Sequence, residues 1–340
     1  MLSKDITWQV EKITEFSLYT SSWNELNLKN NNQSVLSAEF TQALIDNFST
    51  GNELLILGWQ SNELVFAGIF EKLTRFRWRT FQASQAPLGC FICEANLLNV
   101  DIVSMVSKQL PNKPILLDFT QIDSQHHPLK LNTNLFSLPY ISTGKLTVPS
   151  DFDEYFANFS KNSRQNFNKA RNRLAKSDVI TKLEIITDSN AIKEFVAIYG
   201  EIESSGWKSA QGTSIHIDNE QGKFYIDLLT SFASTGAAQI WCYYFNEEVV
   251  AVDLCISMAE TLVILKTTYK EEYAKFSPAI LMKLDAYKQL GIDGKITTIE
   301  YFGKTKDWHK RLQCHERDIY HITWCKFPRL FTWAKKLINN

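Results

Sequence analysis

The chain has 340 residues, of which 44% are hydrophobic, 21% charged and 13% aromatic, and this composition excludes a disordered chain. At about 100–200 residues per domain, the length predicts two domains, which we place at residues 1–149 and 150–340. The 36 basic and 37 acidic residues leave a net charge of -1, which excludes a bulk electrostatic attraction to DNA or to an anionic membrane. Six irregularly spaced cysteines form neither a disulfide framework nor a zinc motif, so no metal site is predicted.

The start of the chain lacks the features of an export signal. Charged residues interrupt every apolar run there, beginning with Lys4 and Asp5. No apolar run in the chain approaches the roughly 18 residues that a membrane span requires. The sequence therefore predicts a cytoplasmic protein without a membrane span.

The first half alternates strand and helix patterns. Two apolar runs separated by a polar turn predict a β-hairpin over residues 54–70. A strand is predicted over 78–83, a helix over 97–110 from apolar residues three and four apart, and a buried strand over 114–119. The order is hairpin, strand, helix, strand.

The second half opens with the densest charge feature of the chain. A capping serine and acidic residues at 150–154 predict the start of a helix of some two dozen residues. Six cations lie within sixteen residues of it, namely Lys161, Arg164, Lys169, Arg171, Arg173 and Lys176. They either complement the dipole of a solvated helix end or form a phosphate-binding surface. Under the second interpretation Arg164, Asn168 and Arg171 are candidate substrate-binding residues.

The elements that follow repeat the order of the first half. Helices are predicted over 192–202 and 219–234, followed by an antiparallel meander with strands at 238–245, 249–257 and 261–268. Ser277-Pro278 then starts a helix, since serine is favoured at the N-cap and proline at the first helical position. Strands at 296–302 and 319–325 complete the set. We interpret the two halves as copies of one α/β fold.

Several ordered segments of the second half resemble the GNAT superfamily, specifically its FemAB-like branch, which includes the CelD-like proteins of polysaccharide gene clusters. The segments are the basic helix at 159–174, Trp207-Lys208 with Phe224-Tyr225, the strand-loop-helix junction at 265–279, and Glu300-Tyr301-Phe302-Gly303 with Trp308-His309-Lys310. The junction is the most specific, because it carries the branch's Tyr-acid-Tyr-Ser-Pro signature. The first half is similar to the family's degenerate N-terminal copy only in its order of elements. The resemblance implies an α/β (α+β) fold of two tandem GNAT-like acyl-CoA N-acyltransferase domains, each a mixed sheet flanked by helices.

The resemblance also implies where an acyl donor binds. In this family the coenzyme A pyrophosphate lies at the N-terminus of the helix that here begins at Ser277, where unpaired amides and the helix dipole favour an anion. The candidate donor-binding residues are Lys266, Thr267, Thr268, Lys275, Phe276, Ser277, Pro278 and Ala279. The family's usual glycine-containing loop is absent, since no glycine lies between Glu271 and Ser277. The donor is therefore left open among acyl-CoA, an acyl carrier protein and an aminoacyl-tRNA.

Acyl transfer to an amine requires a neutral amine, stabilisation of an oxyanion and protonation of the leaving group. The resemblance implies that the thioester lies between two splayed strands, 261–268 and 296–302. Glu300 is then a candidate general base, with a surface acid paired to a lysine as the alternative. Tyr269 and Tyr301 are candidate acids for the leaving thiolate.

Other candidate residues follow from composition and from the resemblance. Asp253 places a carboxylate within an otherwise apolar strand, which is costly unless the group is paired or functional, so Asp253 is a candidate catalytic residue. The remaining candidate substrate-binding residues are Trp207, Lys208, Trp308 and Lys310.

The leading hypothesis is an N-acyltransferase, with acetyl-CoA or another acyl-CoA as co-substrate and acetyl as the expected acyl group. By resemblance, the acceptor amine is a small molecule or is linked to a carrier, such as an amino sugar of a surface polysaccharide precursor. One alternative is FemAB-like aminoacyl transfer to a cell-wall precursor, but the near-neutral net charge argues against tRNA binding. A further alternative is a non-catalytic partner of a polysaccharide assembly machine, which the missing glycine loop favours.

Overall fold

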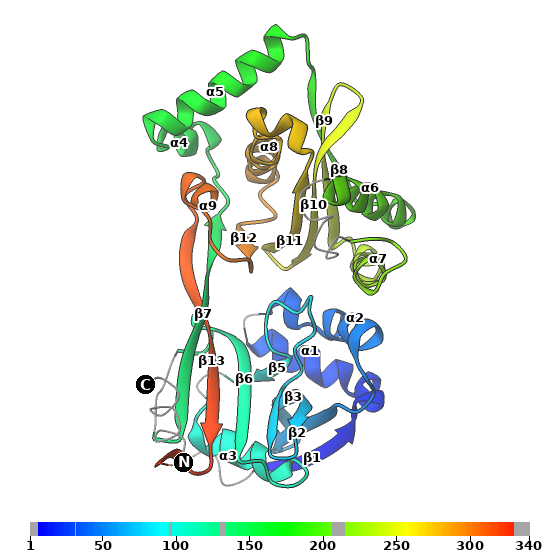
Figure 1. Ribbon diagram of the computed structural model, residues 1–340, viewed down its shortest axis with the longest axis vertical. Helices are drawn as coiled ribbons and strands as arrows, with labels where there is room; N and C mark the ends of the chain where they lie inside the picture. Colours follow the sequence, from blue (N-terminus) through cyan, green and yellow to red (C-terminus); the bar gives the residue numbers. More distant parts are fainter. Residues whose placement is uncertain (1–5, 31, 95–96, 129–132, 206–214, 330–340) are drawn as a thin grey trace. The chain divides into compact units, whose positions relative to one another are not determined.

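The computed structural model describes residues 6–30, 32–94, 97–128, 133–205 and 215–329 (Figure 1). The chain divides into two compact units: the first comprises Met1–Ser142 and Arg317–Asn340, and the second comprises Thr143–Glu316. The C-terminal strand thus belongs to the first unit, whereas division of the sequence at 149/150 assigned it to the second half.

In its described residues, the first unit is a mixed sheet with three α-helices. Its strands are β1 (Thr7–Lys12), β2 (Leu54–Gln60), β3 (Glu63–Thr74), β4 (Arg77–Thr80), β5 (Phe91–Cys93), β6 (Leu116–Asp123), the first part of β7 (Leu135–Thr147) and most of β13 (His315–Cys325). The helices are α1 (Thr20–Lys29), α2 (Ala38–Phe48) and α3 (Val100–Gln109), with short 3-10 helices η1 (Ile13–Tyr19) and η2 (Ser34–Leu36). The predicted hairpin is confirmed, and its turn residues Ser61 and Asn62 both have positive φ (51° and 67°), as a two-residue type I′ turn requires.

The second unit is a mixed sheet with helices on both faces. Its strands are β8 (Thr181–Ile186), β9 (Ala238–Phe245), β10 (Glu248–Met258), β11 (Thr261–Tyr269), β12 (Thr298–Tyr301) and the end of β7. Its helices are α4 (Phe152–Ala157), α5 (Lys161–Lys176), α6 (Ile192–Ser205), α7 (Glu220–Ala233), α8 (Pro278–Asp293) and α9 (Asp307–Arg311), with η3 (Ser189–Ala191) and η5 (Glu271–Phe276). Helix α8 packs on one face of the sheet, and α6 and α7 pack on the other (Figure 1).

The two units share one strand order. The first runs β1-β2-β3-β4-β6-β13 and the second runs β8-β9-β10-β11-β12-β7. In each unit the first four strands pair antiparallel, the fourth and fifth pair in parallel, and the sixth pairs antiparallel. The prediction of two copies of one mixed α/β fold is therefore confirmed.

The prediction of one continuous basic helix after residue 150 is wrong. Two helices form instead: α4 ends at Ala157, and Ser160 caps α5 by accepting a hydrogen bond from the Ser163 amide. Helix α5 buries Phe167, Ala170 and Leu174 and leaves five of its six cations exposed, while Arg164 is half-buried. Among the described residues, no helix combines the length and apolar character that crossing a membrane requires.

Candidate active site

A cleft opens in the second unit where two neighbouring strands separate. Strands β11 and β12 pair in parallel only up to Ile264 and Tyr301, and β11 then continues without β12 to Tyr269. A cavity of about 630 Å³ lies at this separation. Its walls come from β11, from α6, from the start of α8 and from the segment around α9. The separation corresponds to the splayed strands that the family resemblance implies.

Many of the residues predicted from the sequence line this cleft. They are Lys266, Thr267, Thr268, Tyr269, Ser277, Pro278, Ala279, Tyr301 and Trp308. Most come from the β11–α8 junction, because one short helical segment, η5, connects the open end of β11 to the first turn of α8. Tyr269 is 40% exposed, whereas Tyr301 is buried.

The other candidates within the described part of the chain are not among the residues that line the cleft. Glu300 is only 8% exposed and its carboxylate lies 3.5 Å from the ammonium of Lys145, its register partner on β7. The pairing with a lysine matches the alternative interpretation of Glu300, but the side chain is buried rather than at the surface. Lys310 lies 3.8 Å from Glu316, and Lys275 lies against the ring of Phe276.

The candidates on the basic helix also lie outside the lining of the cleft. Arg171 pairs with Asp285 of α8 at 2.6 Å, while Asn168 is exposed and Arg164 is half-buried. Trp207 and Lys208 lie outside the described residues.

Asp253 belongs to a buried ion pair that supports the cleft. Asp253 on β10 is 0% exposed, and its partner Lys283 on α8 is 1% exposed yet lines the cleft. The Lys283 ammonium donates hydrogen bonds to Asp253 and, at 3.1 Å, to Thr267, and it lies 5.5 Å from the centre of the Trp308 ring. Burial raises the pKa of Asp253, and the charge of Lys283 opposes that rise.

Sequence reasoning missed Lys283, although a signal was present. Lys283 lies on the apolar stripe of its helix, three residues after Ile280 and four before Tyr287. A lysine at such a position is desolvated unless an anion accompanies it. Asp253 is likewise a charged residue within an apolar element. The two charges together indicate a buried ion pair next to a site.

An aromatic cluster forms the wall opposite the open end of β11. The hydroxyl groups of Tyr301 and Tyr287 are hydrogen-bonded to each other, and burial raises the pKa of both well above the usual tyrosine value. The His309 ring stacks on Trp308 with 3.5 Å between ring centres. Its Nδ1 accepts the Lys306 amide hydrogen at 3.0 Å, so the neutral ring carries its proton on Nε2.

We expect His309 to remain neutral well below the usual histidine range, because burial lowers its pKa from 6.5 to about 4. As the pH falls from 6.5 towards 4, the unfolded chain takes up this proton before the folded chain does, so the free energy of unfolding decreases. Histidine NMR titration and urea unfolding across this range test both statements. In a His309→Asn variant this part of the acid sensitivity disappears, and a His309 midpoint near 6.5 contradicts the prediction.

Ser277, at the start of α8, has an unusual backbone conformation. Its φ and ψ are 53° and 54°, in the left-handed region, and its hydroxyl makes no capping hydrogen bond. A non-glycine residue in this region costs about 1–2 kcal/mol. Backbone strain of this kind is common where the chain borders a ligand-binding cleft.

Substituting Ser277→Gly is therefore expected to raise the free energy of unfolding by roughly 0.5–1 kcal/mol, because glycine adopts the left-handed conformation without the steric penalty of a Cβ atom. Urea denaturation measures the change. The matched variant Ser277→Ala retains the Cβ atom and is expected to show no gain. An equal gain from both substitutions would show that the backbone conformation is not the cause.

Cations outnumber acids around the cleft. Five basic residues line it, namely Lys266, Lys283, Lys304, Lys306 and Arg311, against the two acids Glu203 and Glu271. The charge of Lys283 is offset by Asp253. The excess positive charge therefore lies mainly on the segment that leads into α9. The cleft therefore suits a ligand with negative charge.

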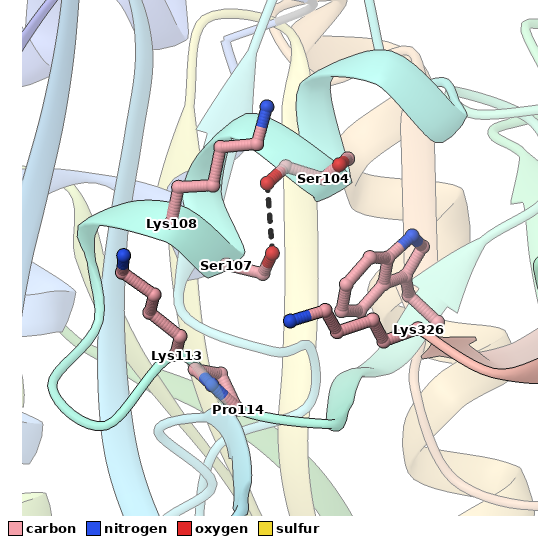
Figure 2. Close-up of a pocket in the computed structure, with 7 residues that line it drawn as sticks. Ser104, Ser107, Lys108, Lys113, Pro114 and Lys326 are labelled. Atoms are coloured by element: carbon pink, nitrogen blue, oxygen red, sulfur yellow. Dashed lines mark hydrogen bonds between the residues drawn. The ribbon is translucent and has the colours of Figure 1, made fainter.

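A second, smaller pocket of about 400 Å³ lies in the first unit (Figure 2). Its lining comprises Ser104, Ser107, Lys108, Lys113, Pro114, Trp324 and Lys326. Figure 2 shows the hydroxyl of Ser107 donating to the Ser104 carbonyl, at 2.7 Å. The lysines lie around the C-terminal end of α3, where they complement its dipole.

Comparison with known proteins agrees with the site geometry. Residues 161–311 match the family model described as an acetyltransferase (GNAT) domain, and this range includes every residue that lines the larger cleft. No curated protein matches the chain by sequence.

Solved structures match the chain over nearly its whole length. FemX is similar with a TM-score of 0.61 at 10% identity, covering 96% of this chain and 99% of FemX. L-PGS from Bacillus licheniformis is similar with a TM-score of 0.54 at 14% identity, covering 93% of this chain and 96% of L-PGS. A tandem GNAT protein from the clavulanic acid biosynthesis pathway is similar with a TM-score of 0.51 at 8% identity, covering 94% of this chain and 98% of that protein. At these identities the likeness concerns the fold alone, and the domain match places an acetyltransferase (GNAT) domain at residues 161–311, within the second unit.

Proposed function

We propose that the protein is an N-acyltransferase that moves an acyl group, expected to be acetyl, from a thioester donor such as acyl-CoA to an amine. The observation that carries the proposal is the separation of β11 from β12 beyond Ile264. On the side that β12 leaves, the backbone of residues 265–269 pairs with no strand of the described chain, so the alternate amide groups that point to this side can hydrogen-bond a thioester carbonyl. This is the geometry that stabilises an oxyanion during acyl transfer.

The charges around the cleft support a donor that carries phosphate groups. The amide of Ser277 donates to the Ala274 carbonyl and Pro278 has no amide hydrogen, so few amides at the start of α8 are available for a pyrophosphate. We propose that Lys304, Lys306 and Arg311 supply the charge that amides of the absent glycine loop supply elsewhere in the family. The donor's phosphates then lie along the segment that leads into α9.

The two tyrosines differ in their fitness to protonate the leaving thiolate. Tyr269 lines the cleft and is 40% exposed. The Tyr301 hydroxyl is hydrogen-bonded to Tyr287, and burial raises its pKa well above the usual value, which makes it a poor proton donor. We propose Tyr269 as the acid and Tyr301 as part of the wall.

The test combines binding with turnover. Purified protein is titrated with acetyl-CoA, a longer acyl-CoA and an acylated carrier protein, with thermal unfolding as the readout. Release of free thiol is then followed with a panel of amines, including free amino sugars and amino sugars linked to a nucleotide or lipid carrier. We expect stabilisation by one donor and amine-dependent thiol release. If no donor stabilises the protein and none is consumed with any amine, the proposal is wrong.

A second candidate function is transfer of an aminoacyl group from tRNA in the FemAB manner. The observation that favours it is helix α5, which carries six cations and no acidic residue and leaves all but one of these cations exposed. For such a surface, the logarithm of the binding constant would fall linearly with the logarithm of the salt concentration. Filter binding of aminoacyl-tRNA at increasing salt, with transfer to a peptide-bearing precursor, distinguishes this function from thioester-dependent transfer.

A further inference from the structure

A buried carboxylate lines the cleft on the face of the sheet that α6 covers. Glu203 is 4% exposed and lies on the inner stripe of α6, seven residues after Val196, four after Tyr199 and three after Gly200. Apolar residues are expected at this spacing on a core-facing helix. A carboxylate there is costly unless it has a structural or chemical role.

The orientation of the Glu203 carboxylate is set by two hydrogen bonds. The Ile215 amide donates to Oε2 at 2.8 Å, and the Tyr199 hydroxyl donates to Oε1 at 3.3 Å. A Cβ atom at Gly200 would lie 2.5 Å from the Ile215 carbonyl oxygen, so glycine at this position permits the close approach that brings the Ile215 amide to Glu203. Each carboxylate oxygen thus accepts one hydrogen bond from a neighbouring group, which holds the plane of the carboxylate.

The cleft presents different chemistry on the two faces of the sheet. Adjacent residues of β11 point to opposite faces: Thr267 bonds Lys283 of α8, whereas Lys266 lies 5.8 Å from the ring centre of Tyr225 on α7. The α8 face therefore carries the Lys283 ammonium beside Trp308. The face covered by α6 and α7 carries the Glu203 carboxylate, with Lys266 held over Tyr225.

We propose that Glu203 forms the subsite for the acceptor amine, in which it binds the ammonium group of a primary amine and takes one proton from it. This inference rests on the proposed acyl transfer. The neutral nitrogen then attacks the thioester carbonyl carbon, the C–N bond forms, and the C–S bond breaks with its electron pair on sulfur. A second proton from nitrogen goes to the thiolate, the third remains on the amide, and Glu203 releases its proton to water.

The first experiment tests the subsite without any acyl donor. Glucosamine and n-butylamine are the probes, with N-acetylglucosamine and n-butanol as their uncharged counterparts, and calorimetry measures binding to the full chain. Because a hydrogen bond to a charged group contributes about 1.5–3 kcal/mol, wild-type protein is expected to prefer an amine over its counterpart by about tenfold or more. Glu203→Gln retains an oxygen that accepts from the Ile215 amide and is expected to abolish the preference.

The control for this arm is Glu201→Gln, which neutralises an exposed carboxylate on the outer side of the same helix. We expect it to keep the wild-type preference. Absence of any amine preference in wild-type protein, or a preference that survives in Glu203→Gln with an unchanged unfolding temperature, would overturn the proposal.

The second experiment measures transfer with the donor identified by thermal stabilisation. At pH 7, Glu203→Gln is expected to lower kcat/KM for the amine by about 100-fold or more, as loss of a general base does, with donor affinity within about twofold of wild type. The deficit in kcat/KM should shrink as the pH rises, because the amine then loses its proton without help, and a merely structural role would not produce that trend.

If wild-type protein binds amines through Glu203 but consumes no donor, the proposed function fails and the subsite stands. If wild-type protein transfers acyl groups and Glu203→Gln does so within about threefold, the subsite is overturned.

Discussion

Replacing Lys283 with methionine is expected to lower the free energy of unfolding of the second unit by about 3–5 kcal/mol, the cost of leaving one buried charge without its partner. The methionine side chain fills most of the lysine volume, so the loss reflects the isolated carboxylate of Asp253 rather than a cavity. Asp253 is 0% exposed, and its Oδ1 has no hydrogen-bond partner among the described residues. Urea unfolding followed by circular dichroism measures the change.

A second variant and the pH dependence of stability distinguish loss of the ion pair from a general disruption of the core. The double variant Lys283→Met with Asp253→Leu removes both charges and is expected to recover most of the lost stability. In the single variant, burial raises the pKa of Asp253 above its unfolded value with no cation to oppose it. The folded state then binds the proton more tightly, so the destabilisation should shrink as the pH falls. A single variant within about 1 kcal/mol of wild type would show that the pair does not support the cleft.

Neutralising the cations before α9 should weaken donor binding. The double variant Lys304→Gln with Lys306→Gln is expected to reduce the affinity for CoA by about tenfold, close to 1.4 kcal/mol, because two charge-assisted contacts to phosphate are lost. The dependence of affinity on salt concentration should flatten as well, since these exposed charges are screened. Calorimetric titration at two salt concentrations measures both effects.

A nearby lysine provides the matched control for this prediction. Lys310 lies on α9 but is not among the residues that line the cleft, and its ammonium lies 3.8 Å from Glu316. Lys310→Gln changes the net charge by one unit in the same region and should leave CoA affinity within about twofold, as expected for a weak surface pair. If Lys310→Gln weakens binding as much as the double variant, the effect is one of total charge rather than of the cleft.

Local patterns predicted the regular elements around the site. The meander of β9, β10 and β11 follows from apolar runs separated by short polar turns, and α8 follows from Ser277-Pro278 and an apolar stripe. These features depend on neighbours within a few residues. Two short elements, β8 and α9, were not predicted. The break between α4 and α5 was not predicted either, because an internal serine cap at Ser160 resembles any other polar residue of a charged helix.

The chemistry of the cleft was only partly predictable. The β11–α8 junction was found because contiguous residues carry the family signature. Lys283 and Glu203 were missed, although each is a charged residue on an apolar helical stripe, because a stripe does not reveal the group that the side chain meets. Glu300 was selected from its strand position, yet it lies opposite Lys145 of β7, a strand more than 150 residues earlier in the chain.

The sequence alone determined the near-neutral charge and two copies of one α/β fold, because composition, periodicity and capping act over short stretches of chain. The likeness to GNAT proteins came from contiguous motifs. Tertiary structure alone decided that β13 closes the sheet of the first unit and β7 that of the second. It also decided that Asp253 meets Lys283 and that Glu203 faces the cleft. Such pairings arise when packed sheets and helices exclude water around charged groups that are distant in sequence. Because burying an unpaired charge is costly, the folded arrangement is one in which each buried charge has a partner.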